Sequence, residues 1–541
     1  MAETSAVNSA TNNPQSPLAP FLNGLRALLT QRPLQLAALV LALAGFTLIS
    51  MMYKFSVMDP DLYWHMAVGD WIVQHGAVPH TGILSRTAAA TPWIAYSWGA
   101  EVLVSRAYAW LGLMGVALYG TALFFLVALS LLWGLLRLAR NFWIALLLWC
   151  AASLGSLFTL MPRPVFFSMA FYVVLLTLLL EAVRTGETKR LWLLPPFFLV
   201  WANLHIQFVY GLFIMGVLFG AVLLQEMVRR TSIPWLAPHK ERIDWLPFQM
   251  PQLAGLIAVC TLATCIGPYT YHVYGVVLGY GRATRTYATI QELQPVSYLF
   301  KEQYLPLFIT ALAFFLLGAR KKLAPYQTLL LVAATVISVR TVRDTWFICF
   351  TAALLVADAV GARASAAESS PAEAAVPVAQ RQRQRFLEAG GVAAAWFVLA
   401  CLIANGTGYN TLGLNREIAT TYPIGACNFL RSAMPPGPMY NTLNWGGFLT
   451  WYLPMYPVAY DGRNDLYEGP VGNVLMRTQT EPGTYTEDPY LKESGFILVD
   501  VKEQLAASLS VNPQYRMIYR DRQAMIFVPN TGAASSEGVQ P

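Results

Sequence analysis

The sequence predicts a mainly α-helical protein with many membrane spans, followed by a small α/β domain outside the membrane. Of its 541 residues, 56% are hydrophobic and 12% are charged, whereas soluble domains carry roughly 25% charged residues. Long apolar runs recur between residues 34 and 404. The part of the chain that follows them has the mixed composition of a soluble domain.

About eleven apolar runs approach the length that a helix needs to cross a bilayer. Several are short, and polar or basic residues bound them. The predicted spans are Leu34–Met52, Leu113–Leu136, Phe142–Met161, Val165–Val183, Leu191–Asn203, Phe208–Met227, Leu253–Ile266, Leu305–Gly318, Leu323–Val339, Trp346–Val360 and Gly391–Ala404.

Basic residues indicate the orientation of these spans, because Lys and Arg gather on the cytoplasmic side of membrane proteins. Every even-numbered span is followed by a basic cluster, such as Arg137 and Arg140 after the second and Arg320 to Lys322 after the eighth. We therefore expect a cytoplasmic N-terminus, with the first loop and everything after residue 404 outside. The net charge of +7 then reflects topology, and no nucleic-acid partner is expected.

The chain divides into segments of different composition. The expected organisation is a disordered cytoplasmic tail at 1–33, a transmembrane core at 34–361 with an external loop at 54–112, a cytoplasmic linker at 362–390, the last transmembrane helix at 391–404, an extracytoplasmic α/β domain at 405–530 and a disordered tail at 531–541. The linker, rich in Ala, Glu, Gln and Arg, has the composition of a disordered segment.

Three segments of the external domain have clear patterns. Phe496 to Val501 reads FILVDV and predicts a buried strand. Lys502 to Ser510 predicts a short helix. Tyr515–Tyr519 and Ala524–Val528 predict a hairpin around residues 521–523.

Two acids stand where the chain leaves the first span, in the sequence MDPDLYWHMAVGDW from Met58 to Trp71. A carboxylate at a membrane edge is costly to desolvate, so Asp59 and Asp61 suggest function. Asp59, which lies nearest the membrane, is the first candidate for a general base. Asp61 would orient it or help to hold a divalent cation such as Mg²⁺ or Mn²⁺. The alternative is structural: Asp61 would cap an amphipathic interfacial helix over Leu62–Gln74.

His65 lies four residues after Asp61, on the same helical face. It would assist the carboxylate or ligate a metal, or else only hydrogen-bond to Asp61 or sit at the interface.

Arginines on the external side form a second signal, because the orientation rule disfavours them there. Arg163 lies in the turn between spans three and four, and Arg340 and Arg343 lie at the outer end of span nine. Guanidinium groups bind phosphate through paired donors, so these residues are candidates for a lipid phosphate. The alternative is that each pairs with a carboxylate, Arg343 with Asp344 for example, or snorkels.

Polar residues at membrane depth form a third signal. Asn203 and His205 lie at the outer end of span five, where polar side chains need partners. A sugar or acceptor in an outward cavity would supply them, and hydrogen bonds between helices are the alternative.

The tail sequence YDGRNDLYE places Asp461, Arg463 and Asp465 in a compact charged loop. The loop either folds back over the membrane cavity to contact substrate or is a turn locked by an Arg–Asp pair. Nearby, Asn444 to Gly447 reads as a hairpin turn, or as a site where Trp445 stacks on a sugar.

These motifs together resemble the GT-C-type membrane glycosyltransferases. The acidic pair in the first external loop matches that family's modified D-x-D motif. DPDLYWHMAVGDWIVQHG, RPVFFS, WANLH, GPYTY and NWGGFLTWYLPMYPVAYDGRNDLYE look like a group of bacterial multi-pass GT-C-like proteins. The resemblance spans most of residues 59–528 and implies a GT-C-like fold, with Asp59 and Asp61 as catalytic residues. The sequence shows no clear acceptor-sequon-reading motif of the kind that oligosaccharyltransferases carry.

The resemblance implies an enzyme of the bacterial cytoplasmic membrane that moves a sugar from a polyprenyl-phosphate donor to an acceptor glycan, lipid or protein on the outer face. A transporter or flippase of an anionic or lipid-linked substrate is the alternative, although no internal inverted repeat is evident. A non-catalytic membrane assembly protein is a further alternative, which leaves the acidic pair unexplained.

Overall fold

The computed structural model describes residues 31–53, 55–156, 161, 163–231, 237–280, 291–297, 303–367, 378–481 and 483–530. Residues 1–30 and 531–541, predicted as tails, and residues 368–377 of the predicted linker lie outside this range. The chain divides into two compact units, one made of segments 1–48 and 371–403 and the other of segments 49–370 and 404–541.

The smaller unit pairs the first part of helix α2 (Arg32–Tyr53) with helix α17 (Val378–Gly406). The Arg32 guanidinium donates to the Glu388 carboxylate at 2.6 and 2.9 Å, and the Trp396 indole donates to the Thr47 hydroxyl at 2.8 Å. Helix α17 begins at Val378, so the prediction of a linker as far as residue 390 was wrong. The Ala, Gln and Arg residues of this stretch are good helix formers, and they extend the last span.

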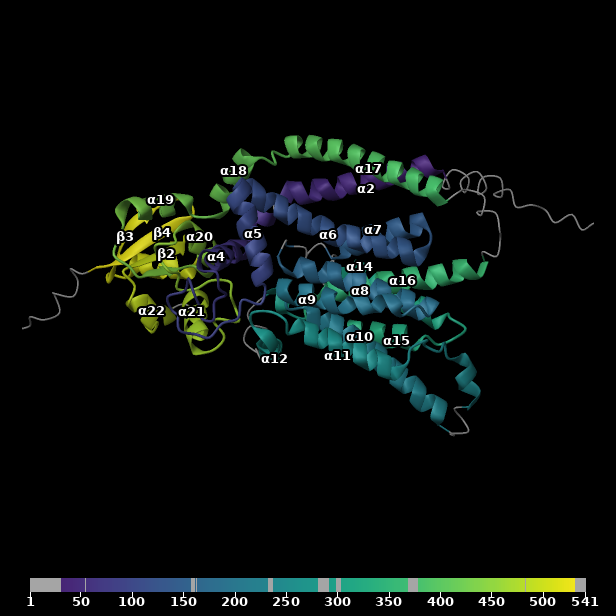
Figure 1. Ribbon diagram of the computed structural model, residues 1–541. Coiled ribbons are helices and arrows are strands. Elements are labelled where there is room, and N and C mark those ends of the chain that lie inside the picture. The colour runs from purple at the N-terminus through teal and green to yellow at the C-terminus, as the bar shows by residue number, and fades with distance from the viewer. Residues whose placement is uncertain are drawn as a thin grey trace, which may run out of the picture. The chain divides into compact units, whose positions relative to one another are not determined.

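The larger unit contains the other predicted spans as helices. These are α6 (Leu113–Ala139), α7 (Phe142–Gly155), α8 (Val165–Thr185), α9 (Leu194–Leu204), α10 (Phe208–Arg230), α11 (Met250–Thr264), α14 (Tyr304–Gly318), α15 (Pro325–Ser338) and α16 (Thr345–Ala367). Helix α6 packs against α8 and α16, α16 against α14, and α9 against α11 (Figure 1).

Six helices in the described part of the chain are long and apolar enough to cross a membrane: α2, α6, α8, α10, α16 and α17. Helices α7, α11, α14 and α15 are apolar but shorter, and α9 has 11 residues. A mainly helical polytopic architecture is thereby confirmed, and the number of spans stays a prediction.

Loops that the basic pattern assigned to one side of the membrane do lie together. Arg184 and Arg320, which follow spans four and eight, both approach the Asp358 carboxylate, at 3.8 and 3.7 Å. Arg137, after span two, pairs with Glu181 at 2.7 Å. The loops after the odd-numbered spans meet elsewhere, around the cavity described below. The alternation is therefore internally consistent, while its absolute direction remains a prediction.

The first loop folds into two helices, α4 (Pro60–His75) and α5 (Trp98–Leu111). Helix α4 packs against α5 and against α20 (Leu443–Tyr452) of the C-terminal region. A Cβ atom at Gly69 would overlap the Glu101 carbonyl, which shows how closely α4 and α5 approach. Eight of the 16 residues of α4 are buried. The helix was predicted, and protein covers most of its apolar residues, although Val73 is exposed. Its position in the lipid interface stays a prediction.

The C-terminal region carries a four-stranded sheet with the order β1-β2-β4-β3. Strand β1 (Met439–Asn441) is parallel to β2 (Phe496–Asp500), and β4 (Ala524–Pro529) is antiparallel to β2 and to β3 (Tyr515–Arg520). The buried strand, the helix that follows it (α23, Gln504–Val511) and the hairpin are confirmed.

Four further helices complete this region: α18 (Thr411–Thr421), α19 (Ile424–Ala433), α21 (Pro470–Thr480) and α22 (Pro489–Lys492). The predicted hairpin turn at residues 444–447 was wrong. These residues lie in α20, where a Cβ at Gly447 would overlap the Pro60 carbonyl. The two glycines of this segment allow α20 to approach neighbouring backbone, which a turn-based interpretation did not consider.

Candidate active site

A small cavity of about 50 Å³ lies where the odd-numbered loops meet the C-terminal region. It has room for a few water molecules. Most of the residues predicted for a site line it: Asp61, His65, Arg163, His205, Arg343 and Arg463. They come from five segments far apart in the sequence, so packing of the helix ends creates this cavity.

The two acids of the first loop have different environments. Asp59 is the N-cap of α4, and its Oδ1 accepts from the Asp61 backbone N–H at 3.1 Å. Its side chain is 2% exposed, whereas the Asp61 side chain is 19% exposed and lines the cavity. The structural alternative named the wrong cap, because Pro60 occupies the first helical position and makes Asp59 the capping residue. Asp61 is the acid that faces the cavity.

Arg163 joins both acids to a third. Its guanidinium donates to both oxygens of Asp59 at 2.6 and 3.0 Å, and lies 3.0 Å from Asp61 Oδ2 and 3.3 Å from Glu292 Oε1. The carboxylates lower the energy of the guanidinium cation, so they raise the pKa of Arg163 although burial opposes this. Three acids surround one cation, which leaves the cluster with excess negative charge.

The pKa of the Asp61 carboxyl group lies closer to neutral pH than is usual for an aspartate. Burial raises its pKa to about 6, and repulsion from Asp59 adds to this effect while Arg163 opposes it. The Trp64 indole donates to Asp61 Oδ1 at 3.2 Å and fixes its orientation. A carboxylate with these properties can accept a proton from a bound hydroxyl group.

A divalent cation does not fit the acidic pair as it is arranged. Arg163 already bonds to Asp59 and Asp61, and a metal ion there would meet a guanidinium at hydrogen-bond distance. No group of three His, Cys, Asp or Glu side chains suited to a metal occurs among the described residues. No step is therefore assigned to a metal.

His65 contacts a different acid from the one expected. Its Nδ1 lies 3.1 Å from Glu101 Oε1, so the expected bond to Asp61 was wrong. Burial raises the pKa of Glu101 to about 8 and lowers that of His65. The pair is therefore held without net charge. The His65 ring, which is tilted by 33° against the Trp64 ring with ring centres 3.5 Å apart, forms part of the cavity wall.

The hydrogen bonds of His205 assign its protonation state. The Gln207 backbone N–H, which can only donate, points at its Nδ1 at 3.4 Å, and the Ser168 hydroxyl lies 2.9 Å from the same atom. Burial, followed by repulsion from Arg343, lowers the pKa of His205 to about 3. We therefore assign a neutral ring with the proton on Nε2, which can donate a hydrogen bond.

The two outer arginines of span nine separate. Arg343 lies in a short 3-10 helix (Val342–Asp344) and lines the cavity. Arg340 lies in the preceding turn and is exposed. Asp344 accepts from the Tyr210 and Thr341 hydroxyls at 2.8 and 2.7 Å. Arg343 is thus the member of the pair placed to meet an anion in the cavity.

Asn203 has protein partners for its side chain. Its amide nitrogen donates to the Leu199 and Ile266 carbonyls, both at 2.8 Å, and its oxygen accepts from the Trp98 indole at 3.0 Å. These contacts join α9, α11 and α5. They favour the interhelical alternative for this residue.

The C-terminal charged loop is locked by its Arg–Asp pair, as one of the two alternatives predicted, and the contact with substrate that the other alternative predicts stays a prediction. Arg463 donates to both oxygens of Asp461 at 2.9 and 2.7 Å, and neither side chain is exposed. The turn is thus locked by an Arg–Asp pair. The same loop lies over the cavity, because a Cβ at Gly462 would overlap the Asp61 carboxylate.

Three residues of the site were missed or given no role: Glu101, Trp93 and Asp465. Trp93 donates to Asp465 at 3.0 Å, and the Arg463 guanidinium lies 4.9 Å from the centre of the Trp93 ring. An acid inside the apolar helix α5 was a visible signal for Glu101. The Trp93–Asp465 contact joins segments 372 residues apart and had no sequence signal.

Comparisons with known proteins give structural neighbours only. The sequence matches no protein-family model, and no curated protein matches it. A crystal structure of ArnT from Cupriavidus metallidurans bound to undecaprenyl phosphate is similar, with 13% identity and a TM-score of 0.44, over 90% of this chain and 97% of that chain. The apo structure of the same protein gives 14% identity and a TM-score of 0.42 over the same shares.

Identities and TM-scores of this size do not transfer an activity or a residue's role to this chain. What the site does must therefore be argued from its own contacts.

Proposed function

We propose that this protein is a membrane glycosyltransferase that moves a sugar from a polyprenyl-phosphate donor to an acceptor hydroxyl on the extracytoplasmic face of the bacterial cytoplasmic membrane. The observation that carries the proposal is a carboxylate with a raised pKa, Asp61, in one cavity with the guanidinium group of Arg343 and a neutral His205. Six helices long and apolar enough to cross a membrane support a lipid-linked substrate.

Asp61 is the proposed general base. Its ionised carboxylate takes the proton of the acceptor hydroxyl as the acceptor oxygen forms a bond to the anomeric carbon. The bond between that carbon and the phosphate oxygen breaks, and its electron pair leaves with the polyprenyl phosphate. This single displacement inverts the anomeric configuration. A base with a pKa of about 6 suits proton transfer near neutral pH.

Asp59 is the proposed positioning residue. It caps α4, and with both oxygens it holds the Arg163 guanidinium that also contacts Asp61. It is nearly fully buried and does not line the cavity as described. The role of general base, predicted for Asp59 because it lies nearest the membrane, is therefore proposed for Asp61 instead.

The leaving phosphate gains negative charge, so it requires hydrogen-bond donors from other side chains that line the cavity. Arg343 supplies a guanidinium for bidentate contact with phosphate oxygens. His205, protonated on Nε2, supplies a neutral donor. Arg163 is already engaged by three carboxylates, which makes it a holder of the acids more than a phosphate ligand.

Reconstituted protein tests this proposal with a panel of radiolabelled polyprenyl-phosphate sugars in liposomes, with transfer to membrane lipid extract and donor hydrolysis as readouts. We expect wild-type turnover on at least one donor and a loss of about 100-fold or more in Asp61→Asn, because removal of a general base has that effect. Arg343→Ala should raise KM for the donor.

Asp70→Asn is the matched control, since Asp70 lies on the same helix but is exposed and contacts Gln74 and Arg106. It should keep wild-type turnover. A folded Asp61→Asn protein that turns over at the wild-type rate would overturn the role of Asp61 and, with it, the proposed mechanism.

A further inference from the structure

A second and larger cavity, of about 690 Å³, lies beside the small one. It is bounded by the end of the first loop, by the segment from Pro268 through helix α12 (Val273–Tyr280), and by the C-terminal charged loop. Asp465 lines both cavities. The volume is in the range of sites for small molecules, whereas the small cavity holds only the reacting groups.

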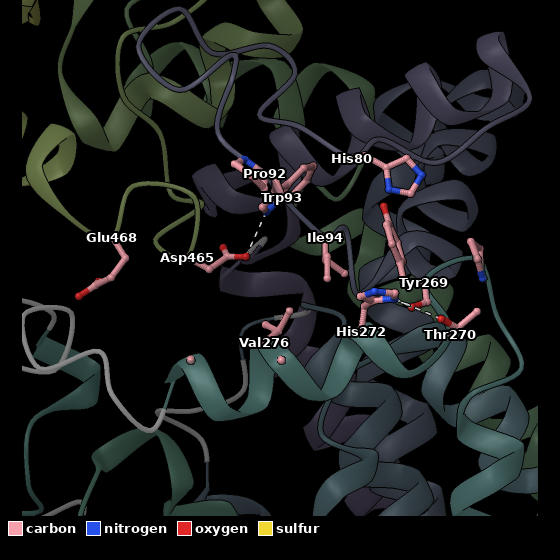
Figure 2. Close-up of a pocket in the computed structure, with 13 residues that line it drawn as sticks. His80, Pro92, Trp93, Ile94, Tyr269, Thr270, His272, Val276, Asp465 and Glu468 are labelled. Carbon is pink, nitrogen blue, oxygen red and sulfur yellow. Dashed lines mark hydrogen bonds between the residues drawn. The ribbon is translucent and has the colours of Figure 1, made fainter.

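Hydrogen bonds hold the walls of the larger cavity in place. The Trp93 indole donates to Asp465 Oδ2 at 3.0 Å (Figure 2). The Tyr269 hydroxyl donates to the Pro79 carbonyl at 2.6 Å and accepts from the Ala95 backbone N–H at 3.2 Å. The two rings are therefore fixed before any ligand arrives, which lowers the entropy cost of binding.

The charges of the larger cavity differ from those of the small one. Asp465 and Glu468 line it from the C-terminal loop, and His80 and His272 line it near Tyr269 (Figure 2). Among the described residues that line it there is no Lys or Arg. The carboxylates that line the cavity disfavour an anionic ligand, and a neighbouring cation, the Arg463 guanidinium, lies over the Trp93 ring at 4.9 Å. Hydroxyl groups can donate to the carboxylates.

Helix α12 carries two glycines where it lines the cavity. Gly275 and Gly279 line the cavity one turn apart, and a Cβ atom at either would contact nothing within 4 Å. The helix thus presents bare backbone on this face, and a ligand ring can approach it closely.

We propose that the larger cavity is the acceptor subsite and that it takes an uncharged saccharide, which reaches Asp61 past Asp465. This proposal rests on the proposed function. The apolar faces of Trp93 and Tyr269 pack against sugar C–H groups, and Asp465 and Glu468 accept hydroxyl hydrogen bonds. The phosphate of the donor stays with Arg343 of the small cavity, so charge separates the two substrates.

Saturation-transfer NMR on the full chain in nanodiscs tests the proposal without turnover. The probes are four neutral disaccharides (cellobiose, lactose, mannobiose and chitobiose) and a glucuronate-containing disaccharide. We expect transfer to at least one neutral probe and none to the uronate. Gly275→Leu should reduce the neutral signal about tenfold or more by filling the cavity, while Gly216→Leu, at an open glycine of α10, should not.

Two results would overturn the proposal: no saturation transfer to any neutral disaccharide, or the same transfer in Gly275→Leu as in wild type. Loss of polyprenyl-phosphate binding in Gly275→Leu, with saccharide binding kept, would assign the cavity to the lipid instead. Asp61→Asn separates the two proposals, because it should bind the disaccharide normally. If that variant also kept full turnover, the proposed mechanism would fail while the saccharide site stood.

Discussion

Two clusters in this protein join Arg to Asp, and they differ in balance. In the C-terminal loop one arginine, Arg463, meets one carboxylate, Asp461, and the pair is completely buried. The Tyr467 hydroxyl and the Ile83 carbonyl occupy the remaining positions of the pair. Such a pair holds the turn in place, because each group of the pair neutralises the charge of the other.

At the small cavity one arginine, Arg163, from the turn before α8, meets three acids, and one of them, Asp61, remains part-exposed to the cavity. Burial raises the pKa of Asp61, and repulsion from Asp59 and Glu292 adds to this effect while Arg163 opposes it. Both clusters contain an Arg–Asp contact. The number of carboxylates that contact each arginine distinguishes the buried structural pair from the part-exposed reactive site.

The largest effect should follow from breaking the balanced pair. Arg463→Ala leaves the Asp461 carboxylate buried without its partner, which typically costs about 3–5 kcal/mol. We expect a strong loss of melting temperature and yield, measured by thermal denaturation in detergent. Arg463→Lys should recover part of it, and a melting temperature equal to wild type in Arg463→Ala would refute the structural role.

The unbalanced cluster should respond in the opposite way. The folded state raises the pKa of Asp61 from 3.8 to about 6, so its contribution to stability is greatest at low pH and is lost as pH rises through about 6. Asp61→Asn should therefore keep or raise the melting temperature at pH 7.5 while activity falls about 100-fold. A marked drop in melting temperature would place Asp61 with the structural pair.

Wild-type activity should also depend on Asp61 ionisation. A base must be deprotonated, so kcat should fall as pH is lowered through about 6. A flat profile between pH 5 and pH 8 would exclude Asp61 as the titrating base.

The contact between the clusters can be tested at Gly462. Alanine there would place a Cβ atom against the Asp61 carboxylate and displace it. We expect kcat to fall roughly 10- to 100-fold, because small displacements of reacting groups have such costs. Gly216→Ala, which meets open space, is the control, and an equal effect in both variants would show that the contact is unimportant.

A smaller effect is expected at Glu101. Its folded-state pKa of about 8 lies above its ordinary 4.5, so the stability it contributes is lost as pH rises through about 8. Melting temperature should fall between pH 7 and pH 9 in wild type, and less steeply in Glu101→Gln. Equal slopes would assign the loss to other groups.

The smallest effect should come from metal removal. Because Arg163 occupies both acids, EDTA should leave turnover unchanged. Restoration of lost activity by added Mg²⁺ or Mn²⁺ would show that a cation displaces Arg163 in the working enzyme.

The sequence by itself determined the helices of the membrane core, the alternation of basic loops, the α4 segment and the buried strand with its hairpin. Each depends on local patterns of apolar length and periodicity, which the chain carries within a few residues. Most of the polar residues that the sequence singled out for a site do line the small cavity, since polar groups at membrane ends are costly without a purpose.

The roles of the residues around the small cavity depend on the tertiary structure. Arg163 reaches Asp59 and Glu292 across 104 and 129 residues, and this sharing determines which acid is held and which faces the cavity. The same applies to His65 with Glu101 and to Trp93 with Asp465. The physical reason is that burial and charge balance, which set the pKa of each group, arise from long-range packing that no local pattern encodes.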